Sequence, residues 1–184
     1  KGANVFTAEK NEYIDRVGFY TLAGTTWHAE VVTDMSDPSD PSSGTVAAQA
    51  DGTTACGGFY KADLSAGVQV DAGESFAVVL TESFKKSAEE NTYYVLFEST
   101  SSLTASVTSA AGQSFYYNGS SYQDSTKGIA TKQGTSNYNN ICIYAYGNAS
   151  ITGAKVSGLD PVYLFSGSEI KPVPTLTVNG TILR

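Results

Sequence analysis

Hydrophobic and polar residues alternate along much of this chain with a period of two residues, which is the period of a β-strand. The clearest case is the segment from Thr26 to Thr33, where Trp27 and Val31 alternate with His28 and Glu30. We expect Trp27 to face a core and His28 to face outward. The other segments of strand character are 13–21, 46–50, 57–64, 68–70, 76–81, 93–98 and 141–146.

Short turns that contain glycine separate these segments, for example Ala23-Gly24-Thr25 and Asp51-Gly52. No window keeps helical spacing over three turns, and only the stretch from Ser83 to Asn91 could form a short helix. Many short strands divided by turns are typical of two packed antiparallel sheets. The pattern therefore predicts an all-β protein with the architecture of an antiparallel β-sandwich.

An aromatic hairpin is predicted in the segment GQSFYYNGSSYQD, residues 112–124. Asn118-Gly119 is a strong signal for a two-residue type I′ turn, in which both central residues have positive φ. Such a turn pairs Phe115 with Tyr122. Side chains alternate along a strand, so Phe115, Tyr117 and Tyr122 share one face, which we expect to be the core face. Tyr116 is then the residue expected to point outward.

Composition narrows the classes of partner. Charged residues make up only 16% of the 184 residues, and the formal net charge is −7. Nucleic-acid binding needs a clustered basic surface, whereas the only adjacent basic pair is Lys85-Lys86, which we interpret as part of a solvated loop. No apolar run approaches the roughly 20 residues that span a bilayer. We expect neither nucleic-acid binding nor membrane insertion, and we expect a monomer.

The two cysteines, Cys56 and Cys142, lie in separate strand-like segments. The sequence leaves open whether they form one inter-strand disulfide or remain two free thiols. Together with the single histidine, His28, they supply too few nitrogen and sulfur ligands for a usual structural zinc site.

The composition changes after Tyr146, where Pro161, Pro172 and Pro174 interrupt isolated short β segments. Asn179-Gly180 predicts another hairpin, but only four residues follow it. We therefore predict a β-sandwich over residues 1–147 and, over residues 148–184, a linker with the truncated start of a second β module. Because the chain does not begin with methionine, we expect it to be a fragment of a longer protein.

Five motifs occur in order along the first part of the chain: ANVFTAEKNEYIDRVGFYT at 3–21, GFYKADLS at 58–65, AGESFAVVL at 72–80, AGQSFYYNGSSYQD at 111–124 and NICIYAY at 140–146. With these motifs the chain resembles the lectin-like domain of bacterial secreted and surface proteins, which often lies beside papain-like cysteine protease domains. Relatives commonly carry tryptophan near the position of Tyr122. The resemblance implies a jelly-roll, lectin-like sandwich that is extracellular or on the surface of a bacterium, with other domains of the same polypeptide as neighbours.

The last part of the chain carries a second resemblance. ITGAKVSGLDPVYLFSGSEIKPVPTLTVNGTILR, residues 151–184, is similar to the first half of a small β repeat of bacterial surface proteins. In that family the pattern continues into further strands. Half of such a unit cannot bury its own apolar face, so the sequence leaves open whether it folds alone, docks on the sandwich or adds a strand to it.

Candidate catalytic chemistry is limited by His28, the only histidine. A Cys56–His28 dyad is one interpretation, and a surface histidine with a core cysteine is the other. The resemblance implies that the protease of such proteins is a separate domain, and none of its motifs occurs in this chain. We predict no enzyme activity and no catalytic residues; a hydrolase that uses His28 is the less favoured alternative.

An acidic loop follows the strand-like segment that ends at Thr33. It contains Asp34, Asp37 and Asp40 among prolines and serines. Three carboxylates can gather around calcium, which prefers several oxygen ligands, although the same residues also describe an extended solvated linker. We predict no required cofactor, and calcium at these three aspartates is the candidate to test.

Sugar binding needs an apolar ring face beside amides and carboxylates that bond the sugar hydroxyls. The predicted ligand-binding residues are Tyr116, Tyr122, Asn118, Gln123 and Asp124. The leading hypothesis is a non-catalytic accessory or adhesion module of a multidomain protein, with a glycan or a host or surface protein as its ligand. A dedicated carbohydrate-binding domain is the alternative.

Overall fold

The computed structural model of the chain describes residues 1–85, 87, 90–98, 107–131, 134–136, 139–149, 154–159, 162, 164, 167–178 and 181–183. The chain divides into two compact units, Lys1–Ala149 and Ser150–Arg184. The first unit contains the predicted sandwich. Each unit is described by itself.

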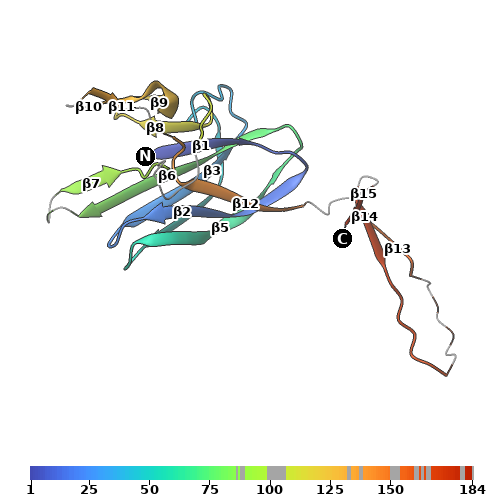
Figure 1. The fold of residues 1–184 in the computed structure, drawn as a ribbon. Coiled ribbons are helices and arrows are strands. Elements are labelled where there is room, and N and C mark those ends of the chain that lie inside the picture. Colours follow the sequence, from blue (N-terminus) through green and yellow to red (C-terminus); the bar gives the residue numbers. More distant parts are fainter. Residues whose placement is uncertain are drawn as a thin grey trace. The chain divides into compact units, whose positions relative to one another are not determined.

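The larger sheet of the first unit has seven strands in the order β4-β3-β6-β1-β8-β9, and β7 pairs with part of β6 (Figure 1). Every neighbouring pair is antiparallel. The strand bounds are β1 (Gly2–Thr7), β3 (Thr26–Thr33), β4 (Thr45–Thr53), β6 (Ser75–Lys85), β7 (Asn91–Tyr94), β8 (Ser114–Tyr117) and β9 (Tyr122–Asp124).

The smaller sheet has the order β12-β2-β5 and faces the larger one (Figure 1). Its strands are β2 (Glu12–Thr21), β5 (Gly58–Val70) and β12 (Ile143–Ala149). The predicted segments 57–64 and 68–70 are one strand, β5, because a register shift between Ile14 and Arg16 of β2 accommodates the extra residues of β5. The all-β antiparallel sandwich predicted from the sequence is confirmed.

One core of buried apolar side chains lies between the two sheets. Phe19 of β2 and Trp27 of β3 meet there, with their ring centroids 4.9 Å apart. Burial of apolar surface in this layer, at about 25 cal/mol per Å², is the main favourable term in folding. Trp27 is buried and His28 is partly exposed, so the predicted alternation along β3 is confirmed. The core comprises Ala8, Ile14, Val17, Phe19, Trp27, Ala29, Val31, Ala48, Val68, Val70, Phe76, Val78, Leu80, Ile141 and Ile143.

The outer face of the larger sheet, which points away from the smaller sheet, carries a second apolar cluster. Its buried members are Ala3, Val32, Ala77 and Val79, and partly buried Val5, Met35 and Tyr122 pack against them. The loop after β3 therefore covers part of this face through Met35. Outside this cluster, the outer face of the larger sheet carries polar and aromatic side chains.

The predicted helix from Ser83 to Asn91 does not begin at Ser83. Ser83, Phe84 and Lys85 belong to β6 and pair with β7, which starts at Asn91. Pairing with β7 outweighs any local helical preference of these three residues. Residues 86, 88 and 89 lie outside the described residues.

The aromatic hairpin forms, but its turn differs from the predicted one. Tyr117 pairs with Tyr122 and Phe115 with Asp124, so the loop has four residues rather than two. Asn118 Oδ1 accepts hydrogen bonds from the backbone N–H groups of Ser120 (2.9 Å) and Ser121 (3.0 Å). Asparagine thus closes the turn through its side chain instead of through the positive φ that a type I′ turn requires.

The outward position predicted for Tyr116 is wrong. The register moves by two residues, which keeps Phe115, Tyr117 and Tyr122 together on one face, as predicted. However, Phe115 pairs with Ala3 of β1, so this shared face belongs to the outer side of the larger sheet. Tyr116 instead packs against the core between the sheets.

The remaining elements are short. In the first unit these are the 3-10 helix η1 (Ser125–Lys127) and the hairpin β10 (Ile129–Thr131) and β11 (Gly134–Ser136). The second unit has one sheet of β13 (Lys155–Ser157), β14 (Thr175–Val178) and β15 (Thr181–Leu183). β14 and β15 pair on either side of the predicted hairpin turn, whose residues 179 and 180 lie outside the described residues.

Both cysteines are free thiols, so the disulfide alternative is not the one formed. Cys56 is exposed in the turn before β5, and Cys142 is partly buried just before β12. Burial and the nearby carboxylate of Glu98 raise the pKa of Cys142 to about 11. The thiol of Cys142 is therefore protonated at neutral pH and a poor nucleophile.

Candidate functional site

A row of outward side chains crosses the larger sheet at right angles to its strands. His28 of β3 pairs with Asp51 of β4 on one side and with Thr81 of β6 on the other. Lys1 continues this row, because its carbonyl accepts the backbone hydrogen bond of Tyr117 (2.9 Å). Tyr117 in turn pairs with Tyr122, so the row ends on two aromatic rings.

A second row runs parallel to the first, two residues further along each strand. Thr26 of β3 pairs with Thr53 of β4 and with Ser83 of β6, and Ser83 pairs with Tyr93 of β7. The residues between the two rows point to the opposite face of the sheet. A channel therefore separates the two rows, with the backbone of the sheet at its base. At the β4 end of the channel, Gly52 lies between Asp51 of the first row and Thr53 of the second.

Three hollows follow one another along this channel. The first has a volume of about 430 Å³ and lies between the two rows on β4, β3 and β6. The second, of about 480 Å³, shares Thr81 and Tyr93 with the first and extends to Tyr117 and Asn118. The third, of about 280 Å³, shares Lys1 and Tyr117 with the second and reaches Tyr122. We call these three hollows together the outer groove.

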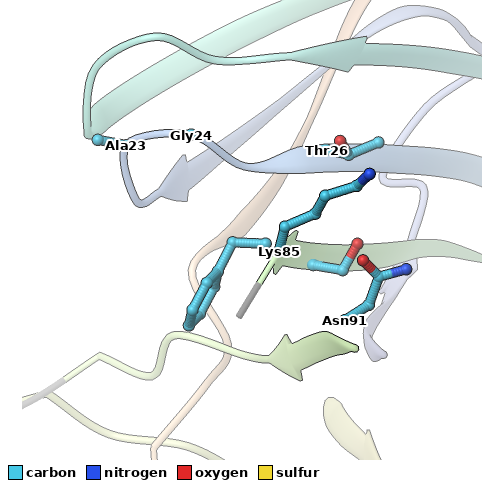
Figure 2. Close-up of a pocket in the computed structure, with 7 residues that line it drawn as sticks. Ala23, Gly24, Thr26, Lys85 and Asn91 are labelled. Carbon is cyan, nitrogen blue, oxygen red and sulfur yellow. The ribbon is translucent and has the colours of Figure 1, made fainter. Parts of the chain in front are cut away.

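A fourth hollow, of about 520 Å³, adjoins the outer groove at its first hollow, with which it shares Thr26 and Ser83. It lies between the β2–β3 turn and the β6–β7 pair (Figure 2). We call it the Lys85 hollow. Its lining residues are Ala23, Gly24, Thr26, Ser83, Phe84, Lys85 and Asn91.

The aromatic rings of the outer groove are accessible. Tyr93 is 62% exposed and Tyr117 is 38% exposed, and both border the hollow of about 480 Å³. The ring centroids of Tyr117 and Tyr122 lie 5.4 Å apart in an edge-to-face arrangement, which fixes the position of Tyr117. Burial, with the nearby carboxylates of Glu30 and Asp40, raises the pKa of Tyr122 to about 12, so its hydroxyl stays neutral and can donate.

His28 is held between two carboxylates on the outer face. Its Nδ1 bonds to Asp51, and its Nε2 lies 3.2 Å from Glu30. Partial burial alone would lower the pKa of His28, but the hydrogen bonds and charges of Asp51 and Glu30 outweigh it and raise that pKa above the usual value. The histidine and Asp51 therefore form a polar end wall of the outer groove.

Four of the five predicted ligand-binding residues divide into two groups. Tyr122 and Asn118 line the outer groove, although the side-chain oxygen of Asn118 already accepts two backbone hydrogen bonds within its turn. Tyr116 and Gln123 pair with each other on the opposite face of the hairpin. The sequence therefore located one part of the groove but not its other walls.

Asp124 has a structural position. One carboxylate oxygen accepts from Thr126 N (2.9 Å) and Thr126 Oγ1 (2.6 Å), and the other from Gly112 N (2.7 Å). Burial alone would raise the pKa of Asp124, but these hydrogen bonds lower it below its usual value. With both oxygens in use, Asp124 caps η1 and anchors the start of the hairpin.

The three aspartates of the predicted calcium site each lie in their own turn. Asp37 accepts hydrogen bonds from the N–H and hydroxyl of Ser39, and Asp40 from those of Ser42. Asp34 accepts from the hydroxyl of Thr33. In the described part of the chain, no group of three or more His, Cys, Asp or Glu side chains is arranged to hold a metal ion. Calcium binding at these residues stays a prediction.

Tyr93 and Tyr117 were not among the predicted site residues, nor were Thr81 and Ser83 between them. Tyr93 is the first of two adjacent tyrosines in a predicted strand, and alternation places one of the two outward. That signal was in the sequence. The register that brings Tyr93 near Tyr117 depends on pairing of both β7 and β1 with β6, which no local pattern gives.

Among the described residues, no helix is long and apolar enough to cross a membrane.

Known proteins share this fold. The model of the lectin-like domain family matches residues 1–147. Two solved structures of the clostridial cysteine protease Cwp84 share the fold. One, determined after propeptide cleavage, has a TM-score of 0.59 at 17% sequence identity. The match covers 81% of this chain and 36% of the solved chain.

The other is the structure of the cysteine protease and lectin-like domains of Cwp84, a surface-layer-associated protein of Clostridium difficile. It has a TM-score of 0.58 at 19% identity, and the match covers 81% of this chain and 32% of the solved chain. The chain thus spans about a third of the length of these solved chains. No curated protein matches. The family match over residues 1–147 means that this chain belongs to the lectin-like domain family.

Proposed function

We propose that this chain is a non-catalytic accessory domain of an extracellular, multidomain bacterial surface protein, and that its outer groove binds a glycan. The observation that carries the proposal is the hollow of about 480 Å³ with the exposed rings of Tyr93 and Tyr117 at its border. Hydroxyl side chains of Thr81, Ser83 and Thr26 continue from this hollow along the groove. Aromatic faces beside hydroxyls suit the mixed apolar and polar surface of a sugar ring.

The chemistry around His28 supports a non-catalytic role. The side-chain partners that the structure describes for His28 are the acids Asp51 and Glu30, neither of which is a nucleophile activated by histidine. Cys142 has a raised pKa, and Cys56 is an exposed thiol in the turn before β5. A general base needs a proton donor within hydrogen-bond reach, and the side-chain bonds that the structure describes for His28 are to carboxylates instead.

The surface location and the multidomain context of the proposal draw on the solved relatives. The protein with the shared fold is described as surface-layer associated, and its structure combines a lectin-like domain with a cysteine protease domain. By analogy, the partners of this chain include other domains of its own polypeptide.

Titration of the 184-residue chain with neutral oligosaccharides, followed by NMR, tests the glycan part of the proposal. We expect binding in the millimolar range or tighter, with shifts at Tyr93, Thr81 and Tyr117. Loss of one ring in Tyr93→Ala or Tyr117→Ala is expected to weaken binding about three- to ten-fold.

The matched control is Tyr20→Ala, because Tyr20 is 46% exposed but lies on the smaller sheet. This control is expected to keep the wild-type affinity. Absence of any binding at millimolar sugar across a broad panel, or equal losses in all three variants, would remove the outer groove as a glycan site.

A further inference from the structure

The Lys85 hollow has polar groups on several sides. In Figure 2 the Lys85 side chain extends from β6 toward Thr26 of β3. Asn91 of β7 pairs with Lys85 and also lines the hollow. The lining thus brings an ammonium group, the hydroxyls of Thr26 and Ser83, and a carboxamide to a space of about 520 Å³.

The described lining of this hollow carries a positive charge, in a protein whose net charge is −7. Among the residues that the structure describes, Lys85 is the one charged residue in this lining, and none of them forms an ion pair with Lys85. The nearest acid along the strand, Glu82, points to the core side, where Tyr94 donates a hydrogen bond to it (3.2 Å). An exposed ammonium that no described carboxylate pairs with can accept a carboxylate from a ligand as its partner.

The position of the hollow links it to the proposed glycan site. It shares Thr26 and Ser83 with the first hollow of the outer groove, and that hollow extends to Tyr93. A ligand that packs against Tyr93 can therefore place its next residue beside Lys85. The overall negative charge of the protein disfavours a polyanion, but a single acidic group on a largely neutral glycan avoids most of that repulsion.

We propose that the Lys85 hollow binds the carboxylate of an acidic sugar, such as a uronic acid, that forms one end of a glycan in the outer groove. This inference rests on the proposed glycan function and specifies its ligand class. Lys85 pairs with the carboxylate, while Thr26, Ser83 and Asn91 bond hydroxyls of the same sugar. The basic residue expected to lie in a solvated loop thus gains a role in specificity.

The test compares two trisaccharides that differ only in whether the terminal residue is glucose or glucuronic acid. We expect the wild-type chain to bind the acidic one about two- to five-fold more tightly at low ionic strength, the range for an exposed ion pair. The preference should shrink as salt is added, since exposed charges are screened. NMR shifts at Lys85 and Asn91, which line the Lys85 hollow but not the outer groove, should occur only with the acidic ligand.

Lys85→Gln should remove the preference and leave the affinity for the neutral trisaccharide unchanged. Lys61→Gln is the matched control, because Lys61 is also an exposed lysine, and it lies over Tyr146 on the smaller sheet. This control should keep the preference. Thermal unfolding of both variants confirms that they fold.

The outcomes separate the two proposals. Equal wild-type affinity for the two trisaccharides, or a preference that persists in Lys85→Gln, overturns the acidic-sugar inference while the glycan function stands. If neither trisaccharide nor any neutral oligosaccharide binds, the glycan function fails and the inference fails with it. If the preference is lost in Lys61→Gln as well, it arises from the overall charge of the protein rather than from Lys85. That result also overturns the acidic-sugar site.

Discussion

The Ser114 hydroxyl donates a 2.7 Å hydrogen bond to Asn4 Oδ1, and the pair joins the two sheets from inside the protein. Asn4 Nδ2 donates to the carbonyl oxygens of Ile141 and Ile143, each at 2.9 Å. Ser114 Oγ in turn accepts from Ile141 N (2.8 Å). Both side chains are buried, and together they tie β1 and β8 of the larger sheet to the start of β12 in the smaller one.

Asn4→Ala should destabilise the fold substantially. The substitution removes three buried hydrogen bonds, one with the Ser114 hydroxyl and one with each of two backbone carbonyl groups, which costs about 2–4 kcal/mol. Urea unfolding measures the free energy of unfolding. The control is Asn148→Ala, whose exposed amide donates one 3.0 Å hydrogen bond to Asp15 and whose loss should cost less than about 1 kcal/mol. Equal costs for the two variants would contradict the linking role.

Glu82 should make the protein less stable as the pH rises. Burial raises the pKa of Glu82 to about 7, against 4.5 in the unfolded chain, despite hydrogen bonds from Thr21 and Tyr94. At pH values between these two pKa values, Glu82 is therefore protonated in the folded state and deprotonated in the unfolded state. Stability contributed by this proton is fully present below pH 4.5, declines as the pH rises to about 7 and is then constant, a loss of roughly 3 kcal/mol.

Glu82→Gln tests this expectation, because glutamine keeps the shape and stays neutral. Stability measured by urea unfolding from pH 4.5 to 8 should decline less steeply in the variant than in the wild type. Glu9→Gln is the control at an exposed position and should follow the wild-type curve. If the decline in stability is as steep in Glu82→Gln as in the wild type, groups other than Glu82 cause it.

Local alternation was sufficient to predict which side chains of a strand share a face. It placed Trp27 and His28 correctly, and it grouped Phe115 with Tyr117 even though the predicted turn was two residues too short. A register error of two residues conserves the faces, because side chains alternate with that same period. The pattern could not say which face meets the core, since that depends on the pairing of Phe115 with Ala3 in a distant strand.

The candidate site was harder to predict for the same reason. Its walls come from β3, β6, β7 and β8, and only long-range pairing brings Tyr93 and Tyr117 to one hollow. Tyr122 and Asn118 could be predicted because they lie at a recognisable turn. Asp124 was predicted to bind ligand because a carboxylate beside aromatic residues looks the same in sequence whether it caps a helix or faces solvent.

Removal of calcium should leave the melting temperature unchanged. The carboxylates of Asp37 and Asp40 each accept two hydrogen bonds from the serine two residues later, so the loop is held without an ion. Thermal unfolding with excess calcium and with a chelator measures the effect, because an ion that binds only the folded state raises the midpoint. A midpoint several degrees higher with calcium would support the predicted site at Asp34, Asp37 and Asp40.

His28 should titrate above its usual pKa, and it gives a single imidazole signal because it is the only histidine. Partial burial opposes the shift, but the bonds to Asp51 and Glu30 favour the charged ring. Stability from this interaction is fully present below pH 6.5 and is lost as the pH rises through the folded pKa. An NMR titration should show the pKa falling toward 6.5 in Asp51→Asn but not in Asp63→Asn, a substitution on the smaller sheet. A wild-type value at or below 6.5 would mean that Asp51 does not stabilise the imidazolium, and the imidazole in the end wall of the outer groove would then be mostly neutral at about pH 7.5.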